Sequence, residues 1–461
     1  MRYYFAFTWY ALIGLLIYLY INNIEEMDLT YMDVIDNKYF RMFWNFPLYV
    51  FMEILFLSII LYDNWKSPKR ENIKKSDTVE DIHVIIPAHK ADQTIEGNIE
   101  HLVDLFHNNI WIAENDGNAE ENEFLKNLCQ KYQIHYVHYE TANKTNALYL
   151  TAKVIREKYS RCKNIILLDD DTILPSTFFI RHDLLEDETT AGYCCCIGVN
   201  KNDEKFNIVE HWVDFEYRTI SFRNRARNYQ TLKFLHGIIC VYRLNAFLEI
   251  FRFNPCLPYG LPFGEDAFAG VSTRMLGYQI KQDNYNTVLT YCPNQLFTFC
   301  KNGREQGYGA SSLFKQRALR WYLSWPRRLF QEISLFLSYD AGSWFGNVLY
   351  RLDCLWYIFI LYVSIIWMHF FQRIALGDFS FSSFSYIRLG FMIVSTLSCY
   401  LRILIMNENE KKNVNPWVLL TFPFFLLFVL FLYGVSFLIS IFYYIPFKRI
   451  DYQKCFGRAI T

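Results

Sequence analysis

The chain has 461 residues, of which 52% are hydrophobic and 19% aromatic, and its 46 basic residues balance its 46 acidic ones. A formal net charge of zero argues against a nucleic-acid-binding protein, which normally carries a basic excess, and the high hydrophobic content excludes an intrinsically disordered chain. The apolar residues are spread unevenly, in a way that indicates a soluble domain between membrane segments.

The N-terminal residues predict two membrane-spanning helices. Residues 3–24 contain no charged side chain over 22 positions, which is enough for a helix across a hydrocarbon core of about 30 Å. A cleaved signal peptide is the alternative, but this apolar run is longer than usual for one and lacks a small-residue cleavage site. Residues 42–62 predict a second span, in which Glu53 must face protein or water. We therefore assign residues 1–62 to two transmembrane helices.

Residues 63–321 predict an α/β domain, because short hydrophobic runs alternate there with helical patterns. The basic side chains Lys66, Lys69 and Arg70 follow the second span, so the positive-inside rule places this domain in the cytosol. Thiols stay reduced in that compartment. We therefore interpret the consecutive Cys194, Cys195 and Cys196 as small core residues of a strand, not as metal ligands or disulfide partners.

The first candidate site residue follows a β-rich run. Residues 83–88 read HVIIPA and predict a strand, and the similar run 110–113 is followed by Asp116 and Gly117. Ligands of an open α/β sheet gather at the carboxyl ends of its strands, so Asp116 is well placed to contact one. An ordinary Asp-Gly turn is the alternative.

The strongest single feature is an apolar strand that ends in three carboxylates. Residues 164–168 read NIILL and are followed by Asp169, Asp170 and Asp171. This concentration of negative charge is costly unless a cation neutralises it, and carboxylate oxygens select hard ions such as Mg²⁺ or Mn²⁺. Asp169 and Asp171 share a face. A solvated acidic turn is the alternative.

Two further segments carry charged side chains that are candidates for a functional site. Gly264, Glu265 and Asp266 open a helical segment, which places carboxylates near a helix N-terminus. The sequence KQRALRW at 315–321 follows on a helix that leads toward the membrane. A helix cap and a basic juxtamembrane face are the respective alternatives.

The C-terminal third predicts further membrane segments. Residues 322–344 predict an amphipathic helix and linker on the membrane surface, for which an ordinary amphipathic core helix is the alternative. Residues 345–447 predict three to four transmembrane helices. The last of them is uncharged from 413 to 447 and must tilt, continue along the interface or break, with Pro423 and Gly434 as candidate break points. We predict that this stretch contains a further crossing, either short or re-entrant, because the basic tail 448–461 should be cytosolic.

On these residues the chain resembles the membrane-bound family 2 glycosyltransferases, and particularly the processive hyaluronan, chitin and cellulose synthases. Their pattern of D, DxD, (G/T)ED and QxxRW is similar to Asp116, to Asp169 and Asp171, to residues 264–266 and to residues 317–321. Hyaluronan synthases also have a GKxxAL segment, similar to the one that begins at Lys144, and a GPLxxYR strand, similar to residues 237–243. The resemblance covers about residues 80–330. It implies a GT-A-like domain with a Rossmann-like mixed sheet, inserted between α-helical transmembrane segments.

The resemblance also implies roles for individual residues. The implied donor-binding residues hold the uridine and the diphosphate of a UDP-sugar, with Mg²⁺ or Mn²⁺ bound by Asp169 and Asp171. Asp266 is implied as the general base of an inverting transfer, with Glu265, Arg320 and Trp321 beside it. Trp321 and Gly264 are implied to contact the acceptor sugar. The implied donor-binding residues are Ala88, Asp116, Lys144, Asp169 and Arg317.

Three functions are compatible with the sequence. The first is a processive synthase of the plasma membrane that extends a polysaccharide and passes it through its own helices, where Glu53 and Arg402 would line a sugar path. The second is an enzyme that adds one sugar to a membrane lipid, because Arg317 stands where the synthases have glutamine, as in the ceramide glucosyltransferase relatives. The third is a scaffold or transporter with a degenerate domain, against which the intact carboxylates argue. Neither the sugar nor the oligomeric state follows from the sequence.

Overall fold

The computed structural model of the chain describes residues 54–62, 81–89, 94–117, 120–140, 143–201, 206–253, 265–297, 312–322, 332, 335–355, 376–377, 393, 396–401, 403 and 414–443. The predicted span 3–24, the tail 448–461 and the polar residues Glu53 and Arg402 lie outside the described residues, as does Gly264.

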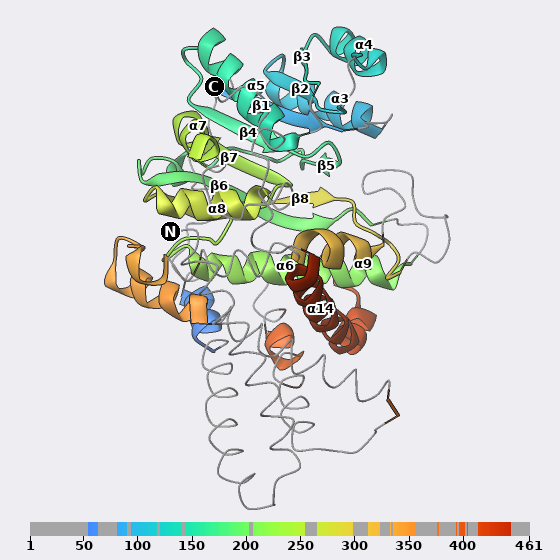
Figure 1. Cartoon of the computed structure of the whole chain (residues 1–461), viewed down its shortest axis with the longest axis vertical. Coiled ribbons are helices and arrows are strands. Elements are labelled where there is room, and N and C mark those ends of the chain that lie inside the picture. The colour runs from blue at the N-terminus through green and yellow to red at the C-terminus, as the bar shows by residue number, and fades with distance from the viewer. Residues whose placement is uncertain are drawn as a thin grey trace, which may run out of the picture.

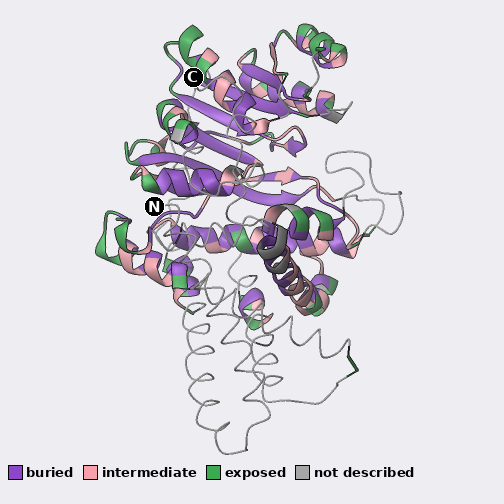
Figure 2. Cartoon of the chain, in the orientation of Figure 1, coloured by how far each residue is buried: buried purple, intermediate pink, exposed green. Residues whose placement is uncertain are grey.

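A single mixed sheet forms the centre of the described structure (Figure 1). Its eight strands lie in the order β3-β2-β1-β4-β7-β6-β8-β5. Figure 2 shows most of the sheet buried, with half-buried residues in β3 and β8, so helices and other segments cover much of both faces. The predicted α/β domain with a mixed sheet is therefore confirmed for the described residues. The strands are β1 (Ile82–Ala88), β2 (Ile110–Glu114), β3 (His135–His138), β4 (Asn164–Leu168), β5 (Thr172–Ile173), β6 (Thr190–Val199), β7 (Ile239–Arg243) and β8 (Gln279–Thr290).

The first half of the sheet is parallel. Strand β1 pairs in parallel with both β2 and β4, and β2 pairs in parallel with β3. All residues of β1 and β4 are buried, which explains the continuous apolar runs of these strands. Helices α3 (Thr94–Phe106) and α4 (Glu123–Tyr132) pack on one face, and α5 (Lys144–Lys158) packs on the other. This arrangement brings the carboxyl ends of β1, β2 and β4 to one edge.

The second half contains antiparallel pairs. Strand β7 is antiparallel to both β4 and β6, whereas β8 is parallel to β6. Cys194, Cys195 and Cys196 are buried residues of β6 with free thiols, as predicted for core residues. The helices of this half are α6 (Ile208–Arg227), α7 (Leu244–Phe253) and α8 (Glu265–Met275).

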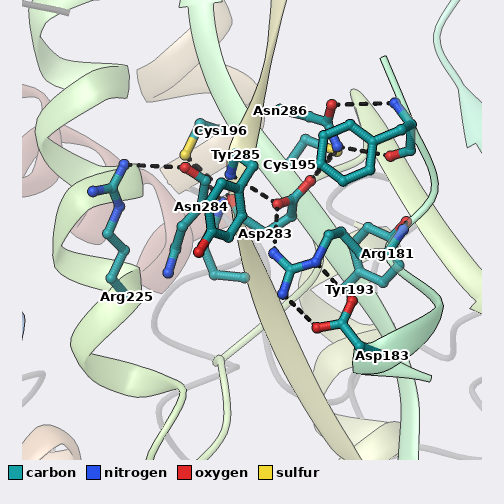
Figure 3. Close-up of polar contacts among 12 residues, drawn as sticks. Arg181, Asp183, Tyr193, Cys195, Cys196, Arg225, Asp283, Asn284, Tyr285 and Asn286 are labelled. Atoms are coloured by element: carbon teal, nitrogen blue, oxygen red, sulfur yellow. Dashed lines mark hydrogen bonds and ion pairs between the residues drawn. The ribbon is translucent and has the colours of Figure 1, made fainter. Parts of the chain in front are cut away.

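A buried carboxylate stabilises an irregularity in β8 (Figure 3). The register of β8 against β6 shifts between Cys194 and Cys196, and Asp283 lies there with no exposed surface. Its Oδ1 accepts hydrogen bonds from the Tyr285 backbone N–H (2.8 Å) and from Arg181 Nη1 (3.2 Å). A bulge leaves backbone donors without strand partners, and the side chain of Asp283 satisfies one of them.

A long apolar helix from the C-terminal part of the chain packs against the α/β domain. Helix α14 (Pro416–Tyr443) runs without interruption through Pro423 and Gly434, so neither residue is the break considered from the sequence. Trp212 of α6 donates a hydrogen bond to Thr421 Oγ1 (2.9 Å), and the rings of Phe215 and Phe422 lie 4.5 Å apart. Among the described residues, one helical segment, 417–437, is long and apolar enough to cross a membrane by length and composition.

The region predicted to lie on the membrane surface is described in part. Residues 335–338 and 344–355 are helical, and Leu337 and Trp344 are each 79% exposed. Glu332, by contrast, is buried against the domain. The placement of residues 322–344 on a bilayer therefore stays a prediction.

Candidate active site

Three chemically important side chains from distant parts of the sequence line one pocket. Lys144 is the first residue of α5, Asp169 follows β4 directly, and Asp266 lies in the first turn of α8. Pro87 of β1 and Gly237, just before β7, also line this pocket. It therefore lies at the carboxyl ends of β1 and β4, where the topology predicts a ligand site.

Lys144 and Asp169 form an ion pair within the pocket. Lys144 Nζ donates to Asp169 Oδ1 at 2.5 Å, and both side chains keep part of their surface in contact with solvent. The start of α5 is fixed by Asn143, whose side chain accepts a hydrogen bond from the Asn146 N–H (3.0 Å). The Asp169 N–H donates to the Ile238 carbonyl (3.0 Å). The two charges are therefore held by defined elements, and a phosphate entering the pocket would meet an ammonium group.

Asp266 lies at the N-terminus of α8. Its Oδ1 accepts a hydrogen bond from the Ala267 N–H (2.8 Å), which orients the carboxylate at the helix start. The partial positive charge of a helix N-terminus favours a carboxylate there. Glu265 is the first residue of the same helix, and the position of its side chain lies outside the described structure.

Asp171 lies beside the pocket and not among the residues that line it. Its Oδ1 accepts a hydrogen bond from Thr290 Oγ1 (3.3 Å). Burial, together with the negative charges of Asp169 and Asp170, raises the pKa of Asp171 to about 8. This surplus of negative charge and the two carboxylates fit a hard divalent cation. Within the described ranges no group of three or more His, Cys, Asp or Glu side chains is placed to hold a metal, so substrate oxygens would have to supply further ligands.

Asp116 lies in the turn after β2. Its carboxylate is almost fully buried and lies 3.6 Å from His89 Nδ1, while the following Gly117 has a φ of +80°. Ala88 is buried at the end of β1, and its carbonyl accepts the Asn115 N–H at 2.9 Å. The predicted uridine-contacting residues therefore lie at the ends of neighbouring strands.

Asn115 was not identified from the sequence. It is buried, and with its amide oriented to satisfy both groups it donates to the Ala88 carbonyl (2.7 Å) and accepts the Lys144 N–H (3.0 Å). Asn115 thus connects the end of β1 to the start of α5. Its place beside Asp116 was visible in the sequence, but no pattern there indicated these partners.

The RALRW segment lies against α6 and α14. Arg317 is buried, and its Nη1 donates to Glu216 Oε1 of α6 (2.7 Å) and to the Tyr322 hydroxyl (2.9 Å). Its guanidinium carbon lies 5.3 Å from the centre of the Trp321 ring. Neither Arg317 nor Trp321 lines the pocket of Lys144, and the side chain of Arg320 is not described. The predicted roles of these three residues in donor and acceptor binding stay predictions.

Comparison with known protein families agrees with this geometry. The central region matches glycosyl transferase family 2. The match covers residues 83–251, which include Ala88, Asp116, Lys144, Asp169 and Asp171. The family 2 region ends before Asp266, so the structure alone links that carboxylate to the pocket. The family match and the mixed sheet together support the predicted GT-A-like fold.

Two of the solved structures that are distantly similar to this chain cover different shares of it. The mannosyltransferase PcManGT from Pyrobaculum calidifontis, in complex with GDP-Man and Mn²⁺, shares 10% identity at a TM-score of 0.44, over 86% of this chain and 99% of its own. GalNAc-T7 with UDP, GalNAc and Mn²⁺ shares 13% identity at a TM-score of 0.34, over 59% of this chain and 55% of its own. Likenesses this remote do not bear on the substrate of the family 2 region. No curated protein matches the chain.

Proposed function

We propose that this protein is an inverting glycosyltransferase that uses a UDP-sugar donor and a divalent cation. The observation that carries the proposal is the pocket in which Lys144, Asp169 and Asp266 meet. Such a transfer requires a positive group that neutralises the charge of the phosphates, here the ammonium group of Lys144. It also requires a carboxylate that accepts a proton from the acceptor, here Asp266.

The roles of the candidate site residues follow from their chemistry and from the family resemblance; of these residues, Lys144, Asp169 and Asp266 line the pocket. Ala88 and Asp116 would contact the uridine, and Lys144 would bind the diphosphate through its ammonium group. Asp266 would take the proton from the acceptor hydroxyl, whose oxygen then forms a bond to the anomeric carbon. The bond from that carbon to the diphosphate breaks on the opposite face, and UDP leaves. The configuration at the anomeric carbon is therefore inverted.

Asp169 and Asp171 are the residues that would hold Mg²⁺ or Mn²⁺. When bound, the cation supplies Lewis-acid stabilisation of negative charge on the diphosphate.

We further propose that the acceptor is a growing polysaccharide, hyaluronan- or chitin-like, which the enzyme passes across the membrane. The order of the motifs and the apolar segments on both sides of the domain support this reading. Addition of one sugar to a membrane lipid is the second candidate, favoured by the arginine at position 317. In the structure, Arg317 forms an ion pair with Glu216 and so anchors the segment 317–321 to α6.

A multi-pass location with the catalytic domain in the cytosol belongs to the same proposal, with the plasma membrane as the expected site. It is supported by the apolar segment 417–437 and by the exposed side chains of Leu337 and Trp344. Large apolar side chains with this much exposure are typical of surfaces that contact lipid or protein.

One experiment tests the reaction and separates the two acceptors. The purified protein is incubated with Mn²⁺ and a panel of labelled UDP-sugars, and the products are separated by size. High-molecular-mass product supports the polysaccharide synthase, whereas one sugar on an extractable lipid supports the second candidate. If no UDP-sugar yields either the high-molecular-mass product or the glycosylated lipid, the proposed function is wrong.

A further inference from the structure

A buried glutamate that the proposed mechanism does not use lies next to the predicted uridine site. Glu114 is the last residue of β2 and is 1% exposed. It lies between Ala88 of β1 and His138 of β3 in the register of the parallel sheet. Carboxylates are rarely buried unless other groups compensate their charge, so we expect neighbouring groups to stabilise the Glu114 carboxylate.

The Glu114 carboxylate binds groups from two further elements. Its Oε2 accepts hydrogen bonds from the Asn122 backbone N–H (3.1 Å) and from the Tyr136 hydroxyl, and it lies 3.2 Å from His138 Nδ1. Tyr136 and His138 belong to β3, whereas Asn122 caps α4, where its side chain accepts the Leu125 N–H (3.3 Å). One carboxylate oxygen therefore joins the ends of β2 and β3 to the start of α4.

These contacts enclose the connection that carries Asp116. The connection leaves β2 at Glu114 and reaches α4 at Asn122, so the same side chain holds both of its ends. On the side toward β1, the Asn115 N–H donates to the Ala88 carbonyl, and the Asn115 carbonyl lies 3.1 Å from His89 Nδ1. Asp116 is thus placed between a backbone anchor and a carboxylate anchor.

We propose that Glu114 is a positioning residue for donor binding, which holds the Asp116 connection in the conformation that receives the uridine and does not itself touch the substrate. This inference rests on the proposed function, because it assigns Asp116 to the donor. Loss of the Glu114 charge would let the connection sample other conformations, so the cost appears in binding of the nucleotide. The chemical step is less affected, because Asp266 is held at the start of α8, away from this connection.

The test compares Glu114→Gln with Glu123→Gln in the full-length protein. Glutamine keeps the size of the side chain but removes its negative charge, which weakens the hydrogen bonds that the Asn122 N–H and the Tyr136 hydroxyl donate to Oε2. Glu123 is exposed on the adjacent α4 and serves as the matched control. The measured quantities are the affinity for UDP alone in the presence of Mn²⁺, the donor KM, kcat and the melting temperature.

We expect Glu114→Gln to weaken UDP binding and raise the donor KM by about tenfold, with kcat changed by no more than about twofold. Glu123→Gln should leave all four quantities unchanged. Tyr136→Phe removes one donor to the same carboxylate and should raise the UDP dissociation constant in the same direction by a smaller factor. This second variant keeps the test informative if Glu114→Gln does not fold.

A purely structural role gives a different result. If Glu114→Gln lowers the melting temperature but leaves UDP affinity and KM at the wild-type values, the positioning role is wrong. It is also wrong if kcat falls while KM is unchanged. The two proposals fail in different measurements. The positioning role of Glu114 is tested by UDP affinity, which is measured without transfer, whereas the glycosyltransferase proposal is tested by the transfer activity of the wild-type protein.

Discussion

Arg274 and Glu332 form an ion pair that is almost completely excluded from solvent, with side-chain exposures of 0% and 1%. Lys233 Nζ also lies 3.3 Å from Glu332, and the Tyr350 hydroxyl donates to the same carboxylate at 3.2 Å. Arg274 is on α8, the helix whose first turn carries Asp266. This pair therefore fastens the helix of the proposed base to the segment that follows the catalytic domain.

Replacement of Arg274 by methionine should strongly destabilise the protein. The change leaves the buried Glu332 carboxylate short of compensating charge, for which a loss of about 3–5 kcal/mol is typical. The melting temperature of the purified variant measures the effect. Arg252→Met is the matched control, because Arg252 is exposed on α7. Equal decreases of the melting temperature in both variants would show that the buried ion pair contributes no more to stability than the exposed Arg252 does.

Asp266→Asn should abolish transfer while UDP binding is kept. Asparagine is close to aspartate in size, but it cannot accept a proton, so kcat should fall by roughly 10²–10⁴-fold. Transfer from the active UDP-sugar and UDP affinity are measured on the same sample. Asp104→Asn, on the exposed side of α3, is the control. A variant that loses UDP affinity as severely as activity would contradict the role of Asp266 as base.

Removal of divalent cations should stop the reaction. EDTA should abolish transfer, and added Mn²⁺ should restore it, because Asp169 and Asp171 are proposed to hold the ion. Asp169→Asn should raise the Mn²⁺ concentration needed for half-maximal activity by at least about tenfold. Asp170→Asn is the control within the same turn; it removes a negative charge near Asp171 but no proposed metal ligand, so it should change that concentration much less than Asp169→Asn does. Full activity of the wild type in EDTA would show that transfer needs no divalent cation.

Acidification should destabilise the fold through His83. This buried side chain accepts a hydrogen bond from Trp111 Nε1 (3.0 Å). Burial and the nearby His135 together lower the pKa of His83 to about 4, and burial is the larger cause. The unfolded chain takes up a proton near pH 6.5, whereas the folded chain resists it, so stability is unaffected above about pH 6.5 and falls as the pH decreases toward 4.

At pH 5 this linkage amounts to about 1–2 kcal/mol. Melting temperatures between pH 7.5 and 4.5 measure it, and His83→Gln, whose side-chain oxygen can still accept from Trp111, should flatten the profile. An unchanged slope in His83→Gln would assign the acid sensitivity to other groups. His236, whose pKa burial also lowers to about 4, is the next candidate.

The sequence was sufficient for strands such as β1, β2 and β4, but it did not predict β3, β5 or β8. Of the predicted site residues, Lys144, Asp169 and Asp266 line one pocket, whereas Ala88, Asp116 and Asp171 are not among its lining residues. Apolar runs such as NIILL of β4 are readable because a strand covered on both faces has few polar positions. The strand ends of a parallel sheet meet at one edge. The pairing of Arg317 with Glu216 was not predictable, because these residues are far apart in the sequence and their contact depends on how α9 (Leu313–Gln316) meets α6. The continuity of α14 was also not predictable, because local propensity disfavours proline inside a helix.

The contact between α6 and α14 has a practical consequence for anyone who wishes to produce the catalytic domain alone. Trp212 stacks on Phe425, and Phe215 meets Phe422, so these rings of the domain are covered by residues from the far end of the chain. An expression fragment that stopped after Tyr322 would present an uncovered aromatic surface to water and would tend to aggregate. Fragments should therefore retain the C-terminal helix, or carry polar replacements on the α6 rings.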